Sequence, residues 1–454
     1  MHAISNAFRR YVVTRARDVR TGIPKLRYWR TLEESQYYPP DEIRSRQWRR
    51  LGLLLQYVAV KNPYYRKLWQ LHEVHPQDIR SQNDFRRLPL LTKREIRENT
   101  LDLISDGFQR ESLLQFRTGG STGKPLTLYA DEECSEFRNA CAWRSDRWAG
   151  WELGEPIGAV WGNSTVPSAF APRLRHWLLT PYIFLDTMAL SESAVVKFAK
   201  DWAAAQPTLL FGHAHSLYLL ALHMRTLKLK SIRPKGIVSS SMALIPAERD
   251  VIESTFGMRV FDRYGCEEVS LIASECEKHN GLHINSDHVF VEFIKDDNTP
   301  AKPGEQGRIV VTDLLNKAMP LIRYVVEDVG VPSDRWCGCG RGLPLMEGVV
   351  GRIADFLTKR DGTKVAGISL IENTLTKIPG IEQLQIVQEA SNVITLNAVP
   401  NADFTPERER QLIGYFRSLF GEDTQVFLNC VVEIPREASG KYRFAINKLE
   451  GSRF

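Results

Sequence analysis

The chain has 454 residues, 43% of them hydrophobic, and carries a formal net charge of +6. This composition supports a large packed core and excludes a low-complexity disordered chain. No apolar run approaches the roughly 20 residues that a membrane-spanning helix needs, and no signal-peptide pattern follows the N-terminal arginines. Seven scattered cysteines argue against a disulfide framework. We therefore expect a cytoplasmic protein.

The positive charge is concentrated at the N-terminus. Residues 1–50 hold twelve Lys and Arg against five Asp and Glu, a net charge of +7. Apolar side chains recur there at helical spacing, with arginines around them: Ile4, Phe8, Tyr11, Val12, Val19; Arg9, Arg10, Arg15, Arg17, Arg20. Such a basic amphipathic helix would place residues 1–30 on an anionic membrane surface or an acidic protein. The alternative is a helix packed on its own domain with its arginines in water. The arginines belong to no recognisable nucleic-acid-binding motif, so nucleic-acid binding is not expected.

The predicted elements begin with helices and continue as alternating strands and helices. Helices are expected at 41–75, with a break at 61–65, then after Thr92, at 137–148 and at 191–205. Thr92 and Glu95 have the spacing of a capping box. Short buried strands are expected at 208–211 and 236–239, and their separation by a helix predicts parallel pairing. Ligands would then bind at the carboxyl ends of these strands.

The last hundred residues have a different character. They predict a hairpin of 382–387 with 393–399, a helix between Thr405 and Gly421, and a final strand at 426–434. The predicted fold is α/β, a large domain with mixed sheets followed by a small α+β domain. The expected divisions are a basic helical segment (1–50), a large nucleotide- and acyl-binding domain (51–350) and a small mobile domain (351–454).

Residues 117–125, Arg-Thr-Gly-Gly-Ser-Thr-Gly-Lys-Pro, have the composition of a phosphate-binding loop. Glycines let backbone N–H groups face an anion, while hydroxyls and a lysine add donors. The residues in these roles are Thr118, Gly119, Gly120, Ser121, Thr122, Gly123 and Lys124. Pro125, where a Walker motif has Ser or Thr, excludes that motif. A plain surface turn is the alternative.

Further motifs follow this loop in a fixed order. They are Tyr264-Gly265-Cys266-Glu267-Glu268, a strand candidate at 307–314, Pro320–Tyr324 with Asp328, Gly351-Arg352, and Pro435–Lys441. Together with the loop, this series resembles the adenylate-forming superfamily. It looks most like the phenylacetate–CoA ligase branch, including capsule-locus CapK-like relatives. Leu88–Lys93, Ala273–Cys276 and Gly281–His283 are also typical of that branch, and the resemblance runs from about Leu51 to the C-terminus.

The resemblance implies an ATP- and Mg²⁺-dependent enzyme. Residues 118–124 would hold the phosphates together with the motif that contains Tyr264 and Gly265. Glu268 matches the magnesium-binding glutamate, and a carboxylate suits that hard cation. Read without the family, Glu267-Glu268 is an exposed acidic pair. Asp328 matches the aspartate that binds the ribose hydroxyls, although Val326-Glu327 replace the usual Thr-Gly before it.

Two further catalytic residues come from the resemblance alone. Lys441 matches the lysine that bridges carboxylate and α-phosphate oxygens. Arg352 lies where the family rotates its small domain, although the usual Asp or Lys two positions later is Ala354.

Four residues form a candidate metal site. Cys276, His283, Cys337 and Cys339 combine thiolate and imidazole ligands, which favour structural Zn²⁺. His279 is a rival for His283, and cysteines without metal are the alternative.

We therefore expect activation of a small carboxylic acid as its acyl-adenylate, then transfer to coenzyme A. One alternative transfers the acyl group to an amine, a hydroxyl or a carrier-protein thiol, as in surface-polysaccharide modification. Another is a non-catalytic nucleotide-binding scaffold. By analogy of position, Trp161, Gly212, His213, Ser240, Ser241 and Met242 surround the acyl group. The sequence leaves the acid and the oligomeric state open.

Overall fold

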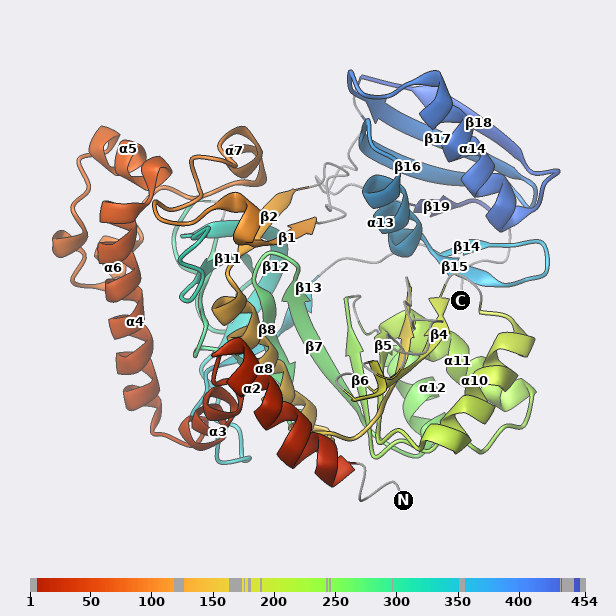
Figure 1. Cartoon of the computed structure of the whole chain (residues 1–454), viewed down its shortest axis with the longest axis horizontal. Helices are drawn as coiled ribbons and strands as arrows, with labels where there is room; N and C mark the ends of the chain where they lie inside the picture. The colour runs from red at the N-terminus through yellow and green to blue at the C-terminus, as the bar shows by residue number, and fades with distance from the viewer. Residues whose placement is uncertain are drawn as a thin grey trace.

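The computed structural model describes residues 6–117, 126–162, 174, 176–178, 181–187, 190–241, 244, 246–295, 297–350, 356–432, 434 and 445–449. These residues form an eleven-stranded mixed sheet with helices on both faces, and a separate four-stranded sheet near the C-terminus (Figure 1). The expected fold, a large α/β unit with mixed sheets and a small C-terminal unit, is confirmed. The domain boundaries stay predictions, and a helix runs through residue 50.

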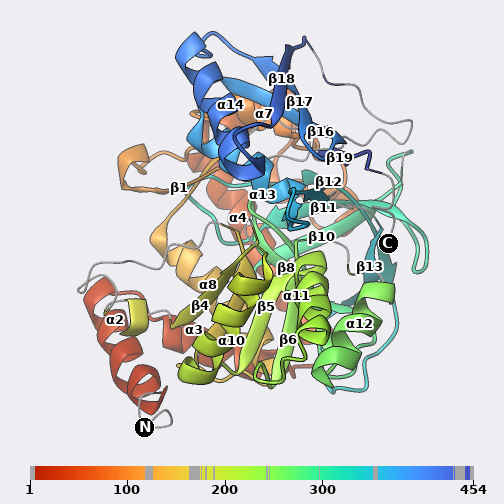
Figure 2. The ribbon, with the colours of Figure 1, turned by 90° about the vertical axis from the view of Figure 1, so that its right-hand side faces the viewer.

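One half of the large sheet is parallel, in the order β7-β6-β5-β3-β4. Its strands are β3 (Ile157–Trp161), β4 (Tyr182–Asp186), β5 (Leu209–His213), β6 (Gly236–Ser240) and β7 (Val260–Cys266). One face is covered by α10 (Glu192–Ala205), α11 (Ala214–Thr226) and α12 (Pro246–Phe256) (Figure 2). The opposite face packs on α3 (Lys25–Ser35) and α8 (Glu132–Trp148). Both faces of this half are thus covered, and the predicted parallel pairing of the buried strands at 208–211 and 236–239 is confirmed.

The other half is antiparallel, in the order β10-β11-β12-β13-β9-β8-β7. Its strands are β8 (Ser270–Glu275), β9 (Leu282–Ile284), β10 (Val289–Ile294), β11 (Gly307–Asp313), β12 (Tyr324–Ser333) and β13 (Leu345–Val350). The motif 264–268 lies partly within β7 and partly in the turn that follows it. Tyr264 and Gly265 lie within β7, because they pair with Ala273 and Leu271 of β8 across a β-bulge. A Cβ on Gly265 would meet the Ser270 carbonyl oxygen at 2.5 Å, so this close approach requires glycine.

The N-terminal half supplies helices that pack around the sheet. They are η1 (Arg9–Val13), α2 (Thr14–Thr21), α4 (Pro40–Lys61), α5 (Pro63–Leu71), η2 (Pro76–Asp78), α6 (Gln82–Phe85), α7 (Lys93–Glu98) and η3 (Arg110–Ser112). The predicted capping box is confirmed, since Glu95 N–H donates to Thr92 Oγ1 (3.3 Å) and Thr92 N–H donates to Glu95 Oε2 (2.7 Å). No helix in the described part of the chain has both the length and the hydropathy to cross a bilayer.

The C-terminal unit has its own sheet and apolar core. Its elements are β14 (Phe356–Thr358), β15 (Lys364–Ala366), α13 (Gly367–Lys377), β16 (Ile381–Ala390), β17 (Val393–Pro400), α14 (Pro406–Phe420), β18 (Gln425–Cys430) and β19 (Ala445–Asn447). The hairpin of β16 with β17 and the Thr405 cap of α14 are confirmed. The expected final strand at 426–434 is too long and is not the last, because β19 follows and pairs parallel to β16.

Candidate active site

Glu268 follows the end of β7 and is held from two sides. The Tyr324 hydroxyl donates to Glu268 Oε1 over 2.6 Å, and both side chains are buried. The Arg138 guanidinium donates to the Glu268 carbonyl oxygen (3.0 Å) and pairs with the buried Asp313 carboxylate. Burial, with the Glu268 charge beside it, raises the pKa of Tyr324 well above its usual value. Its hydroxyl therefore remains a donor and holds the carboxylate through Oε1.

Asp328, on β12, is held in the same way by a side chain of β7. The Tyr264 hydroxyl donates to Asp328 Oδ2 over 2.9 Å. Strand β7 thus contributes Tyr264 beside the turn that carries Glu268, while β12 contributes Tyr324 and Asp328. Three strands separate β7 from β12 in the sheet order, so the two links join segments that are not neighbours in the sheet. We call these two hydrogen bonds the tyrosine–carboxylate links.

The backbone before Asp328 forms a bulge. Val310 pairs with Val325 and Arg308 pairs with Val329, so the three residues 326–328 lie opposite one residue of β11. Glu327 has φ +71°, a left-handed conformation in which glycine is favoured. The usual Thr-Gly of the resembling family places glycine at this position. Glu327 instead accepts an ion pair from the buried Lys93, whose Nζ lies 2.7 Å from Oε2.

The segment 88–93 supports this bulge through its backbone. Leu91 N–H donates to the Arg323 carbonyl oxygen and Val325 N–H donates to the Leu91 carbonyl oxygen, each over 2.9 Å. Arg323 makes two bonds to the buried Glu292 carboxylate, at 2.9 and 3.1 Å. In the sequence this segment is only typical of the branch, and no local signal predicts that Lys93 lies beside the aspartate motif.

Several predicted site residues lie outside the described residues. They are Thr118, Gly119, Gly120, Ser121, Thr122, Gly123, Lys124, Met242, Arg352 and Lys441. The phosphate-loop candidate is bracketed by β1 (Leu114–Arg117) and β2 (Thr127–Ala130), which pair antiparallel with Arg117 opposite Thr127. Strand β2 is anchored by Asn316, whose amide donates to the Tyr129 carbonyl oxygen over 2.8 Å. The two ends of the loop therefore lie side by side, next to the turn between β11 and β12.

An aromatic cluster ends strands β3 and β5. The Trp161 ring lies 3.9 Å from the His213 ring and stacks on Phe211 at 5.1 Å between centroids. His213 is buried, and this desolvation lowers its pKa to about 3, so the ring is neutral at physiological pH. Ser240 ends the neighbouring strand β6. The carboxyl ends of the parallel strands thus present a largely apolar, aromatic wall, where the sequence placed the acyl group.

The four predicted metal ligands lie together at the other end of β8. Their ligand atoms all lie within 4.8 Å of one another, with Cys276 Sγ 3.5 Å from Cys337 Sγ and Cys339 Sγ 3.3 Å from His283 Nε2. His279 is not part of this group, since its Nδ1 lies 3.2 Å from the Glu275 carboxylate. The cluster fastens the segment before β13 to strands β8 and β9.

The geometry of this Cys₃His cluster fits a zinc ion. Thiolates 2.3 Å from a tetrahedral zinc lie about 3.8 Å apart, and a thiolate and an imidazole nitrogen lie about 3.6 Å apart. His283 Nδ1 lies 3.2 Å from the Leu343 carbonyl oxygen and donates to it, which leaves Nε2 free to act as a ligand. Burial lowers the pKa of His283 to about 4, so the ring is neutral, as metal binding requires.

Comparison with known proteins agrees with this architecture. Residues 357–448 match the family model described as the CapK C-terminal domain. Phenylacetate-coenzyme A ligase of Escherichia coli (strain K12) is 27% identical over 70% of this chain and 73% of its own length. The enzyme of that name from Aromatoleum evansii is 25% identical over 92% of this chain and 97% of its own length. Protein CapK of Staphylococcus aureus is 23% identical over 87% of each chain.

Solved structures of 2-hydroxyisobutyryl-CoA ligase share the fold. The complex with 2-HIB-AMP and CoA in the thioesterification state has a TM-score of 0.62 at 21% identity, over 92% of this chain and 91% of that one. An open conformation of the same enzyme has a TM-score of 0.56 at 22% identity, over 87% of this chain and 90% of that one. The chain is therefore similar, over most of its length, to AMP-forming acid–thiol ligases of the adenylate-forming superfamily. Within that superfamily, the similarity is to the phenylacetate-CoA ligase and CapK branch.

Proposed function

We propose that this ligase uses ATP and Mg²⁺ to activate a small carboxylic acid and then transfers the acyl group to coenzyme A. The observation that carries the proposal is the pair of tyrosine–carboxylate links, which hold Glu268, in the turn after β7, and Asp328, on β12. An acid is activated when its carboxylate attacks the α-phosphorus and pyrophosphate leaves. That step needs the nucleotide held at both its sugar and its phosphates.

Each described residue has one task in this scheme. Glu268 would hold Mg²⁺, which neutralises phosphate charge when bound. Tyr324 orients that carboxylate, and Arg138 fixes its backbone. Asp328 accepts the two ribose hydroxyl protons in hydrogen bonds, while Tyr264 keeps its carboxylate in place.

The residues outside the described part complete the proposal. Residues 118–124 would bind the β- and γ-phosphates through backbone N–H groups, hydroxyls and Lys124. Lys441 would stabilise the negative charge that develops between the carboxylate and the α-phosphate. Arg352 would lie at the pivot between adenylation and thioester formation. These three assignments rest on the motif resemblance of the chain to its branch.

The acid itself would lie against Trp161 and His213. A half-buried aromatic surface beside a buried, neutral imidazole favours a flat, apolar acyl group over a sugar acid, because polar hydroxyls placed there would lose part of their water. The names of the relatives from Escherichia coli and Aromatoleum evansii, phenylacetate-coenzyme A ligase, are consistent with an arylacetic acid. We therefore place arylacetic acids first among the candidate substrates.

The test is acid-dependent pyrophosphate release over a panel of aryl, fatty, amino and sugar acids, with and without coenzyme A. Release with one acid that accelerates on addition of coenzyme A supports the full proposal. Pyrophosphate release that does not change with coenzyme A, but accelerates with an amine, a hydroxyl compound or a carrier protein, would identify that compound as the acyl acceptor instead. Silence over the panel while ATP still binds would favour the scaffold alternative. Glu268→Gln and Lys441→Ala serve as inactive controls, and Lys441→Ala should keep ATP binding.

We further propose that Cys276, His283, Cys337 and Cys339 hold a structural zinc ion. Strand β8 alone spans about 17 Å, so the cluster is remote from Glu268 and would stabilise the fold without taking part in the reaction. Metal analysis of the purified protein should find about one zinc per chain, and Cys339→Ser should abolish it. A metal-free protein with unchanged stability would contradict this assignment.

A further inference from the structure

The N-terminal helix has its polar and apolar faces reversed. Residues 6–21 run as one continuous helix through η1 and α2. A helix on the surface of a globular protein ordinarily turns its apolar stripe toward the core and its charges toward water. Here the side chains exposed to solvent include the apolar ones: Phe8, Tyr11, Val12, Ala16 and Val19. Val19 is 85% exposed and Tyr11 is 55% exposed.

The inward face is held by arginines. The buried Arg9 donates to the Gly154 carbonyl oxygen and to the Trp177 carbonyl oxygen, each over 3.0 Å. Arg10 forms an ion pair with Glu152 at 3.1 Å, and Arg17 pairs with the buried Glu136. The expectation that a helix packed on its own domain leaves its arginines in water is therefore wrong for these three residues.

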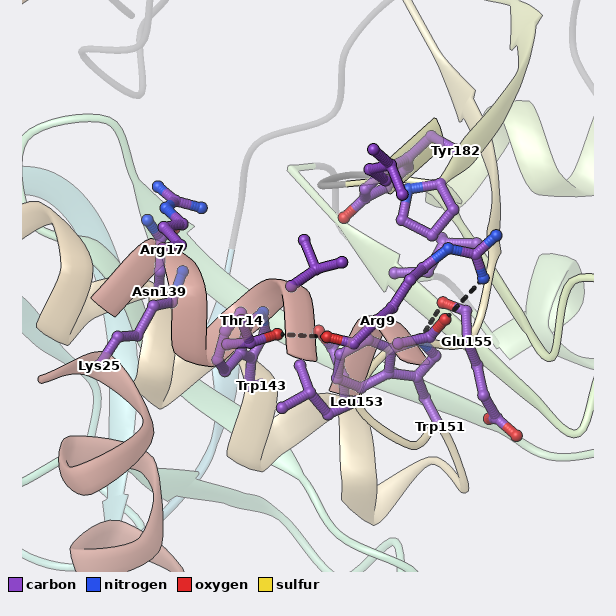
Figure 3. A pocket seen from close by; sticks show the side chains of 16 residues that line it. Arg9, Thr14, Arg17, Lys25, Asn139, Trp143, Trp151, Leu153, Glu155 and Tyr182 are labelled. Atoms are coloured by element: carbon purple, nitrogen blue, oxygen red, sulfur yellow. Dashed lines mark hydrogen bonds between the residues drawn. The ribbon is translucent and has the colours of Figure 1, made fainter. Parts of the chain in front are cut away.

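The helix covers a cavity of about 270 Å³, and Figure 3 shows Arg9, Thr14 and Arg17 along its wall. The cavity is also lined by Lys25 of α3 and Trp143 of α8. The helix thus touches the body of the protein mainly through polar contacts, and its own apolar side chains contribute little to the core.

The N-terminal helix lies in close contact with the backbone at Gly154. Gly154 has φ +93°, and a Cβ placed on it would lie 2.6 Å from the Asn6 carbonyl oxygen. A side chain at position 154 would therefore push the start of the helix away. This fit and the arginine contacts fix which face of the helix points outward.

We propose that this outer face binds an anionic membrane surface, with the helix lying in the plane of the interface. Arg15 and Arg20 are exposed beside the apolar stripe. Residues 1–30 hold eight Lys and Arg against a single acid, Asp18. An apolar stripe bordered by arginines is the pattern of helices that lie at the boundary between lipid headgroups and acyl chains. Anionic headgroups supply the charge that complements these arginines.

The size of the stripe favours lipid over a protein partner. From residue 8 to residue 20 a helix rises about 18 Å, and its face is about 10 Å wide, which gives about 180 Å². A stable protein interface buries about 800 Å² on each partner, so this stripe alone would be too small for one. A lipid surface has no such minimum, because headgroup charge and apolar insertion add to each other.

The test is sedimentation of the full chain with vesicles of phosphatidylcholine alone or with 30% phosphatidylserine. We expect binding to the anionic vesicles and little to the neutral ones. Each arginine near an anionic surface contributes about fivefold, so Arg15→Gln with Arg20→Gln should weaken binding about 25-fold. Val19→Glu should weaken it at least tenfold, because it removes an inserted apolar side chain and adds a repelled charge.

Val60→Glu is the matched control, since Val60 is 65% exposed on α4, outside the N-terminal helix. This variant should bind like the unchanged protein. Equal binding to both vesicle types, equal loss in Val19→Glu and Val60→Glu, or no vesicle binding would each overturn the proposal. Dimerisation that Val19→Glu abolishes would replace it with a contact between copies. Pyrophosphate release without vesicles should be unchanged in all variants, so this test and that of the ligase activity fail independently.

Discussion

Replacing Tyr324 by phenylalanine should raise the Mg²⁺ requirement of ATP binding. The change removes only a hydroxyl, which donates to Glu268 over 2.6 Å in a buried setting. A hydrogen bond to a charged group contributes about 1.5–3 kcal/mol. Loss of a group that orients a metal ligand typically weakens metal binding about 10–100-fold. Since Arg138 still holds the Glu268 backbone, the carboxylate stays in the site but loses its fixed direction.

The matched control is Tyr264→Phe, which deletes the other tyrosine–carboxylate link. Asp328 would lose a donor at 2.9 Å, so ATP affinity should fall while the Mg²⁺ midpoint stays unchanged. The assay is calorimetric titration of ATP at a series of Mg²⁺ concentrations, which needs no knowledge of the acid. Circular dichroism and thermal unfolding check that both variants fold.

The difference in Mg²⁺ midpoint between Tyr324→Phe and Tyr264→Phe tests whether the two carboxylates have separate roles. Equal shifts of the Mg²⁺ midpoint in both variants, or no shift in Tyr324→Phe, would refute the assignment of separate metal and ribose roles to the two carboxylates. A general loss of ATP affinity in both, with unchanged Mg²⁺ dependence, would show that the links only stabilise the fold.

Four further outcomes follow from the structure. Cys339→Ser should release zinc to a chromophoric chelator and lower the melting temperature by several degrees, with kcat unchanged where the protein remains folded. Burial lowers the pKa of His288 to about 4 from 6.5; the unfolded chain therefore binds more protons between these values, and stability falls as pH drops, by up to about 1.4 kcal/mol per unit. The free energy of unfolding, measured with urea at pH 7, 6 and 5, should change less with pH in His288→Gln than in the unchanged protein. An equal pH dependence in the two proteins would contradict this. Glu327→Gly relieves a left-handed backbone at φ +71°, worth about 1–2 kcal/mol, but removes the carboxylate beside buried Lys93. Glu327→Gly alone should lower the free energy of unfolding, and adding Lys93→Met should restore it. A single variant more stable than the unchanged protein would refute the importance of the Lys93–Glu327 pair. Trp161→Ala should raise KM for the acid at least tenfold and leave KM for ATP within twofold, as initial rates would show.

The sequence predicted local features well because their signals are local. The capping box at Thr92 and the parallel strands around 208–211 and 236–239 follow from spacing and from continuous apolar runs. Motif order likewise identified Glu268 and Asp328 as candidates. The four candidate metal ligands could be proposed from residue type, although the sequence left the choice between two histidines open.

Other features depend on contacts between distant segments and left no local signal. The partner of Tyr324 lies 56 residues away and that of Tyr264 lies 64 residues away. The replacement of glycine by Glu327 could be noticed, but the positive φ and the Lys93 contact could not. Helical periodicity located the N-terminal stripe, yet the inward face was decided by Gly154 and Glu136, more than a hundred residues further along the chain.

The tyrosine–carboxylate links also have a consequence for folding. Both links close loops of more than fifty residues, and they join strands that are not neighbours in the sheet. Contacts of such sequence separation form slowly, because chain entropy must be lost before they can be made. No isolated fragment that lacks either strand can therefore assemble the site. During refolding, recovery of ATP binding should lag behind recovery of helical signal, and bound nucleotide would report that the large sheet is complete.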